Sequence, residues 1–176
     1  MGIKINLPNS SLEAISIMAK KPIKKIKIVE SAKVILSLSE ASQRSYKDLM
    51  NIHYEILGEY QKFGPSRDYT HTNYYKKYSI RKNPWPHNRI VHRINSFFNL
   101  YEKIKVEGLQ ETSDPLCVID LRNFNFIPCK PSFILNGDKN RCIEFYRWNG
   151  SHRCAIAKIL NINEIPVVLT KIKINE

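Results

Sequence analysis

No apolar run of the length that a membrane span requires occurs in this sequence of 176 residues. A transmembrane helix needs about 18 or more consecutive apolar residues, and none of the apolar stretches approaches that length. The first residues also lack the basic and apolar regions of a secretory leader. We therefore expect a cytoplasmic protein that does not contact a membrane.

Cysteine is scarce, and its spacing does not suit metal binding. No two of the four cysteines have the spacing of roughly two to four residues that is typical of a zinc knuckle; they are Cys117, Cys129, Cys142 and Cys154. We expect no metal site built from protein side chains. We also expect reduced thiols that pack as small hydrophobic groups.

Acidic residues are in short supply as well. The chain has 16 Asp and Glu against 28 Lys and Arg, a formal net charge of +12 and an isoelectric point near 9.6. Such an excess is typical of proteins that contact nucleic acid, nucleotides, phosphorylated metabolites or acidic surfaces. A general enrichment in Lys, Ile and Asn would give the same total without any such partner. Both interpretations stay open at this point.

The length and composition suit one globular domain with an appendage, because 43% of the residues are hydrophobic and 25% are charged. Residues 1–64 are predicted to form a helical, basic N-terminal extension, and residues 65–176 an α/β (α+β) domain. Within the extension, residues 39–63 have the three-and-four spacing of an amphipathic helix. His53 lies in its apolar stripe without a second ligand nearby, so we expect a packed histidine.

The middle of the chain combines tyrosine with positive charge, with ten Lys or Arg and two acidic residues from Lys62 to Lys105. Single-strand binders use this combination, because bases stack on aromatic rings while cations follow the phosphates. The tyrosines could instead anchor an irregular loop to the core with their hydroxyls in water. If the segment binds nucleic acid, the residues that we expect to do so are Lys76, Lys77, Arg81 and Lys82.

The second half of the chain is predicted to contain both helix and strands. Residues 87–107 form a clear amphipathic helix, and Gly108 suits the left-handed position after it. The short apolar runs "PLCVIDL", "SFIL" and "IEFYRW" follow and are predicted strands. The last of them continues through "NGS" into a helix, "HRCAIAKIL", and then through "NINE" into a strand, "IPVVL".

The polar segment "NGSHR" at the start of that last helix is a candidate anion site. A strand that enters a helix through glycine leaves the first helical amides without intrahelical partners, at the positive end of the helix dipole. Ser151 could cap those amides itself, which would give the residue a purely structural role. Arg153 supplies a planar fork that suits a phosphate, whereas His152 as a general base would need an orienting partner.

The segment "GSHRCAIAKILNINEIPVVL" resembles the signature of the ParB/sulfiredoxin superfamily, in which a Gly-x-His-Arg turn opens a helix shortly before an Ile-Pro-Val strand. Upstream, "SIRKNPWPHNR" is similar to the proline-containing first box of that fold, and "LYEKIKVEGLQ" to the helix end before its next strand. The resemblance covers residues 79–170. It is strongest over residues 149–168, and it is closest to small bacterial members with a Gly-Ser-His-Arg turn.

The resemblance implies that this turn binds nucleotide phosphates. Sulfiredoxins have a cysteine where this chain has Ser151, so reduction of sulfinylated peroxiredoxin is not expected. Kinases of the fold have acidic residues at positions that match Asn149 and Asn88, so a carboxylate would have to come from elsewhere; candidates are Glu102, Asp120 and Glu144. ParB proteins continue into a helix-turn-helix domain, which we do not expect in this chain.

The functional hypothesis is therefore an ATP-dependent or related phosphotransferase that acts on a small hydroxyl-bearing metabolite, with ATP or CTP and Mg²⁺ as cofactors. The alternative is a nucleic-acid-binding adaptor of the ParB type that uses the basic middle segment. The predicted catalytic residues are His152, Glu102 and Asp120. The predicted nucleotide-binding residues are Asn149, Gly150, Ser151, His152, Arg153 and Arg89.

Overall fold

The computed structural model describes residues 15–16, 25–41, 47–110, 115–124, 144–147 and 149–175. It shows an α+β protein with one four-stranded mixed sheet in the order β1-β4-β2-β3. The strands are β1 (Lys25–Ser37), β2 (Cys117–Asp120), β3 (Phe145–Arg147) and β4 (Glu164–Asn175). Strand β4 is antiparallel to β1 and parallel to β2, and β2 is antiparallel to β3. The expected mixture of helix and strand is confirmed.

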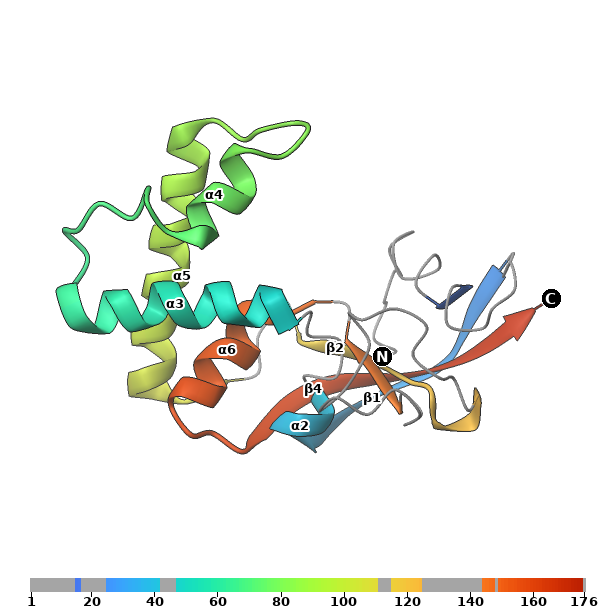
Figure 1. Cartoon of the computed structure of the whole chain (residues 1–176). Helices are drawn as coiled ribbons and strands as arrows, with labels where there is room; N and C mark the ends of the chain where they lie inside the picture. The colour runs from blue at the N-terminus through green and yellow to red at the C-terminus, as the bar shows by residue number, and fades with distance from the viewer. Residues whose placement is uncertain are drawn as a thin grey trace.

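Strands β1 and β4 form a long antiparallel ribbon that reaches well beyond the helices (Figure 1). The register runs from Lys25 opposite Asn175 to Ser37 opposite Glu164, with an irregularity between Ile28 and Glu30. Strand β1 thus precedes the predicted boundary at residue 64 and pairs with a strand far beyond it. The alternation of Lys and Ile at residues 25–28 has the period of a strand, which explains why this part of the expected helical extension is extended. The boundary itself stays a prediction.

The larger helices gather at one end of the sheet (Figure 1). Helix α6 packs against α3 and α5, and α4 packs against both of those helices. The short helix α2 packs against α6 and the sheet. The helices are α2 (Leu38–Ala41), α3 (Lys47–Phe63), α4 (Asn73–Ser79), α5 (His87–Glu107) and α6 (Ser151–Ile159), with a short 3₁₀ turn at Arg122–Phe124.

A continuous core joins these helices to the sheet. It contains Phe97 of α5, Ile156 of α6 and Val167 of β4, each at most 3% exposed. His53 of α3 is 3% exposed and lies edge-on to Phe97, with ring centroids 5.5 Å apart. The prediction of a packed histidine at this position is confirmed.

Several local predictions can be compared with the described residues. Helix α5 matches the predicted helix over residues 87–107, and Gly108 follows it with a φ of 73°. The strands predicted in "PLCVIDL" and "IEFYRW" are β2 and β3. Cys117 and Cys154 are buried, as expected for cysteines that pack as small hydrophobic groups. The predicted strand "SFIL" and the two remaining cysteines lie outside the described residues.

Across the segments that the structure describes, every helix is too short or too polar to cross a membrane.

Candidate functional site

Gly150 stands between β3 and α6 in a conformation that only glycine adopts easily. Its φ and ψ are 78° and 22°, in the left-handed region. A Cβ atom at this position would lie 2.7 Å from Cγ of Leu116, which directly precedes β2. The turn is therefore pressed against the sheet, and both backbone conformation and close packing require glycine here.

Helix α6 starts without a side-chain cap. Gly150 is the N-cap residue, and its carbonyl oxygen accepts the first helical hydrogen bond, from the Cys154 amide at 3.0 Å. Ser151 is the first helical residue, and its hydroxyl oxygen accepts a bond from Arg147 instead of capping the helix. Within the described part of the chain, the amides of Ser151 and His152 have no hydrogen-bond acceptor.

Arg147 brings a buried guanidinium group to the start of α6. The residue is 3% exposed, and its Nη1 donates hydrogen bonds to the Asn149 carbonyl oxygen at 2.7 Å and to the Ser151 hydroxyl at 3.0 Å. Arg147 was not among the residues predicted from the sequence. A signal was present, because Arg147 is a charged residue within the apolar run "IEFYRW", and buried arginine nearly always has a specific partner.

Asn149 ties the turn to β2. Its Nδ2 donates to the Pro115 carbonyl oxygen at 2.9 Å, and its Oδ1 accepts a bond from the Cys117 amide at 2.7 Å. Both ends of the side-chain amide are therefore used within the protein. This geometry favours a structural role for Asn149, although the residue lies within the turn as predicted.

His152 points into the helical core. Its ring stacks on Phe97, with centroids 4.1 Å apart, and lies 4.9 Å from the ring of His53. Its Nε2 shares a 2.7 Å hydrogen bond with the Tyr74 hydroxyl. Burial first, and then the charges of nearby basic groups, lower the pKa of His152 from 6.5 to about 2. The ring is therefore neutral at neutral pH and is not a charged phosphate ligand. A group with so low a pKa is also a weak base, which does not favour a role as general base.

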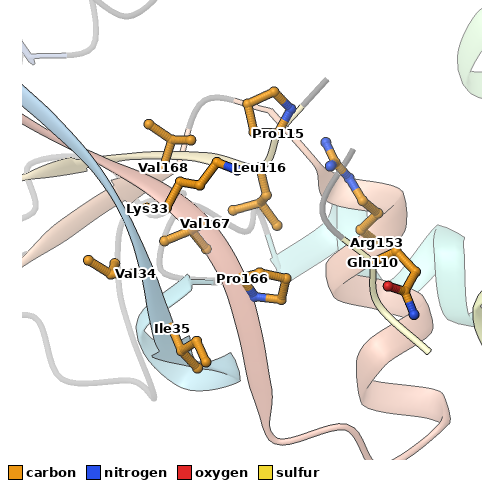
Figure 2. Close-up of a pocket in the computed structure, with 10 residues that line it drawn as sticks. All are labelled: Lys33, Val34, Ile35, Gln110, Pro115, Leu116, Arg153, Pro166, Val167 and Val168. Carbon is orange, nitrogen blue, oxygen red and sulfur yellow. The ribbon is translucent and has the colours of Figure 1, made fainter. Parts of the chain in front are cut away.

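Arg153 lines a pocket beside the turn, with a volume of about 170 Å³. Figure 2 shows its side chain beside Pro115 and Leu116, with the Lys33 side chain approaching the same two residues from β1. The remaining wall comes mainly from apolar residues of β1 and β4, and Gln110 adds a polar group. An arginine at the edge of an apolar hollow suits a ligand that has both a charged and an uncharged part.

The other predicted catalytic residues have contacts away from this turn. Glu102 of α5 forms an exposed ion pair with Lys105, at 3.9 Å. Asp120 is the last residue of β2, and the amide of the first residue, Cys117, donates a hydrogen bond to Asn149. Asp120 therefore lies about 10 Å along the strand from the turn. Arg122 binds both oxygens of Asp120, at 2.9 and 2.7 Å, and these bonds lower the pKa of that carboxyl group.

The last predicted nucleotide ligand, Arg89, lies in the first turn of α5, where its guanidinium is 4.1 Å from the ring centroid of Trp85. The structure thus brings together residues 149–153 and adds Arg147. Glu102, Asp120 and Arg89 contact other groups. The catalytic roles of Glu102 and Asp120 and the nucleotide-binding role of Arg89 stay predictions, and these contacts do not favour them.

The residues of the nucleic-acid alternative lie on α4 and in the turn after it. Lys76, Lys77, Arg81 and Lys82 are all exposed. The tyrosines of this region behave differently, because Tyr69, Tyr74 and Tyr78 are 6%, 0% and 8% exposed. These three rings therefore anchor the segment to the core and are not available for base stacking.

The described residues offer no group of three or more His, Cys, Asp or Glu side chains that could hold a metal ion. They do not fit a Mg²⁺ site made from protein carboxylates. A nucleotide fits better, because main-chain amides and guanidinium groups are ligands that phosphates prefer.

Comparisons of the chain with protein-family models, with curated proteins and with solved structures found no match in any of the three. The class that the structure defines is an α+β protein with a four-stranded mixed sheet and a glycine turn that opens helix α6.

Proposed function

We propose that this protein binds nucleotide phosphates at the start of α6, in a domain related to the ParB/sulfiredoxin superfamily. The single observation behind the proposal is the position of Arg147. Its guanidinium is buried and bonded to Ser151 at a helix N-terminus that has no side-chain cap. A fixed positive charge next to the positive end of a helix dipole is stabilised by a bound anion.

The pocket beside Arg153 supports a nucleotide rather than a free phosphate ion. Its volume of about 170 Å³ is below the roughly 300 Å³ at which pockets for whole drug-sized ligands begin, so it would hold only part of a nucleotide. The apolar wall suits the base or sugar, while Arg153 and the first amides of α6 would bind the phosphates. ATP and CTP are both candidates.

Transfer of a phosphoryl group to a small hydroxyl-bearing metabolite is the further part of the proposal. Such a reaction requires a group that accepts the hydroxyl proton. His152 is a poor candidate, because its low pKa makes it a weak base and its Nε2 already shares a hydrogen bond with Tyr74. When bound with a nucleotide, Mg²⁺ would neutralise phosphate charge. Residues of this chain would position the nucleotide through the α6 amides and Arg153.

Calorimetric titration with ATP, CTP and GTP in the presence of Mg²⁺ tests the proposal. We expect saturable binding that Arg153→Ala weakens about 10- to 100-fold, which corresponds to the loss of one or two charge-assisted hydrogen bonds. Lys158→Ala is the matched control, because Lys158 is an exposed cation in the last turn of the same helix. Equal affinities in the wild type and Arg153→Ala, or no binding of any nucleotide, would contradict a phosphate site here.

A further inference from the structure

Helix α4, the turn after it and the first two turns of α5 have positive charge without compensating acids. From Tyr69 to Tyr101 the sequence contains six Lys or Arg and no Asp or Glu. The fold keeps these cations at one end of the helical layer, because α4 packs on α5. We call them the α4–α5 basic surface: Lys76, Lys77, Arg81, Lys82, Arg89 and Arg93.

Three of these cations lie close to the ring of Trp85. The guanidinium carbons of Arg81, Arg89 and Arg93 lie 5.1, 4.1 and 5.6 Å from the centroid of its ring. The ring also stacks on Tyr78, with centroids 4.7 Å apart and planes 21° apart. Cation–π contacts thus hold three like charges close together, and this arrangement reduces the entropy that the arginines would lose on binding an anion.

Several basic residues elsewhere in the described chain pair with carboxylates. Lys171 pairs with Glu30 at 2.8 Å, Arg122 with Asp120 at 2.7 Å and Arg67 with Glu59 at 3.4 Å. Within the same described segments, no ion pair joins the α4–α5 basic surface to a carboxylate. Single exposed lysines elsewhere, such as Lys62, Lys158 and Lys173, also have no ion pair within the described segments, whereas the α4–α5 basic surface brings six basic residues together around one turn.

The electrostatic effect of the cluster is visible in neighbouring groups. The pKa of Lys77 is lowered by partial burial first, and the charges of Arg93 and Arg81 lower it further. Both Arg93 and Lys77 also contribute to the low pKa of His152. Burial is the larger cause in both groups, and the charges of the cluster add to it.

We propose that the α4–α5 basic surface binds single-stranded nucleic acid through its phosphate backbone, without strong sequence preference. A chain of regularly spaced phosphates matches cations spread over two helices and a turn, and arginine suits phosphate geometry. Trp85 is half-buried and Ile80 is 78% exposed among these charges, so unpaired bases would find apolar contacts. A duplex would keep its bases away from such contacts.

This proposal is independent of nucleotide binding at α6. It also differs from the sequence prediction, because Tyr69, Tyr74 and Tyr78 are buried and the cations nearest to an aromatic ring are the arginines around Trp85. Arg89 and Arg93 join the four predicted residues.

The test is fluorescence anisotropy of labelled 20-nucleotide dT and U strands, titrated with full-length protein at several salt concentrations. We compare the triple variant Arg81→Gln/Lys82→Gln/Arg89→Gln with the control Lys62→Gln/Lys103→Gln/Lys173→Gln. Both variants lose three charges, and all six side chains are exposed. We expect at least a 30-fold loss of affinity in the first variant and less than a threefold loss in the control. A plot of log K against the logarithm of the salt concentration has a negative slope. Its magnitude should decrease by about 2 in the first variant, or by about 0.7 for each lost phosphate contact.

A second measurement places the strand on this surface. The chain has two tryptophans, so a Trp148→Phe variant reports on Trp85 alone, and bound dT should quench its fluorescence. Arg153→Ala should bind dT as the wild type does. Equal losses in the two triple variants, unchanged Trp85 fluorescence on binding, or no binding at low salt would overturn the proposal. Tighter binding to vesicles containing anionic phospholipid than to either strand would also overturn it, because the partner would then be a membrane surface.

Discussion

The start of α6 and the α4–α5 basic surface are both positively charged, yet they hold their charges in different ways. Arg147 is buried and fixed by two hydrogen bonds to the turn that it supports. Arg89 is exposed and contacts the ring of Trp85, in a cluster of like charges. A few buried donors suit one compact phosphate group, whereas exposed cations spread over a surface suit an extended polyanion. The same excess of basic residues can therefore serve two kinds of recognition.

The turn before α6 should be much less tolerant of substitution than exposed parts of the chain where an added side chain has room. Gly150→Ala combines a positive φ with a Cβ atom 2.7 Å from Leu116, so we expect it to reduce the free energy of unfolding by about 3 kcal/mol. Gly64→Ala has a φ of 75° but open space around it, and a loss of about 1 kcal/mol is expected. Urea unfolding measures both values.

Gly58→Ala completes this series. Gly58 lies in α3 with nothing within 4 Å of an added Cβ, so alanine should stabilise the protein by up to about 1 kcal/mol. If all three substitutions had the same effect, Gly150 would not be pressed against Leu116 as the structure shows.

The next largest effect concerns pH and His152. Its folded-state pKa of about 2 is below the ordinary 6.5, so between these values the unfolded chain binds a proton that the folded protein does not. Stability should therefore fall as the pH drops below about 6.5, by about 2 kcal/mol between pH 7 and pH 5 from this group. Unfolding free energies measured across this pH range give the slope.

His152→Gln should remove that part of the slope. His92→Gln is the control, because His92 is exposed on α5, and it should keep the wild-type slope. Identical pH dependence in the wild type and His152→Gln would mean that His152 is not held neutral in the core.

The smallest expected effect is at Asp120, outside both regions. Asp120→Asn removes the ion pair with Arg122, which is 53% exposed, so a loss of about 1 kcal/mol is expected at neutral pH. The lowered pKa of Asp120 means that this stabilisation is present above its ordinary pKa of 3.8 and is lost at lower pH. ATP and CTP affinities should change less than twofold. A large loss of affinity would place Asp120 in the binding site after all.

Local periodicity was enough to predict helix α5 and the unit formed by β3, α6 and β4. The pairing of β1 with β4 was not predicted, because it depends on residues about 140 positions apart. Both strands carry the same alternation, so that Ile28 lies opposite Ile172 and Lys27 opposite Lys173. The alternation at residues 25–28 is typical of a short strand or extended arm, and "IPVVL" is a predicted strand, but neither pattern identifies the partner with which the strand pairs.

The candidate site was predicted in part for a similar reason. The glycine turn has a recognisable sequence, and the structure places Gly150 and Arg153 at the start of α6 and beside a pocket. The direction of the His152 ring follows from its packing on Phe97, which sequence spacing does not reveal. The role of Arg147 depends on its burial, and charge patterns along a sequence do not report burial.

The most direct test of the phosphate site is a nuclear magnetic resonance titration of the ¹⁵N-labelled protein with ATP, CTP and inorganic phosphate. The account predicts saturable shifts of the Ser151, His152 and Arg153 amides, because these are the first amides of α6. The amides of Arg81 and Arg89 should change little with a nucleotide and should respond to single-stranded dT. Nucleotide-induced shifts confined to the α4–α5 basic surface, with unchanged amides at the start of α6, would contradict the account.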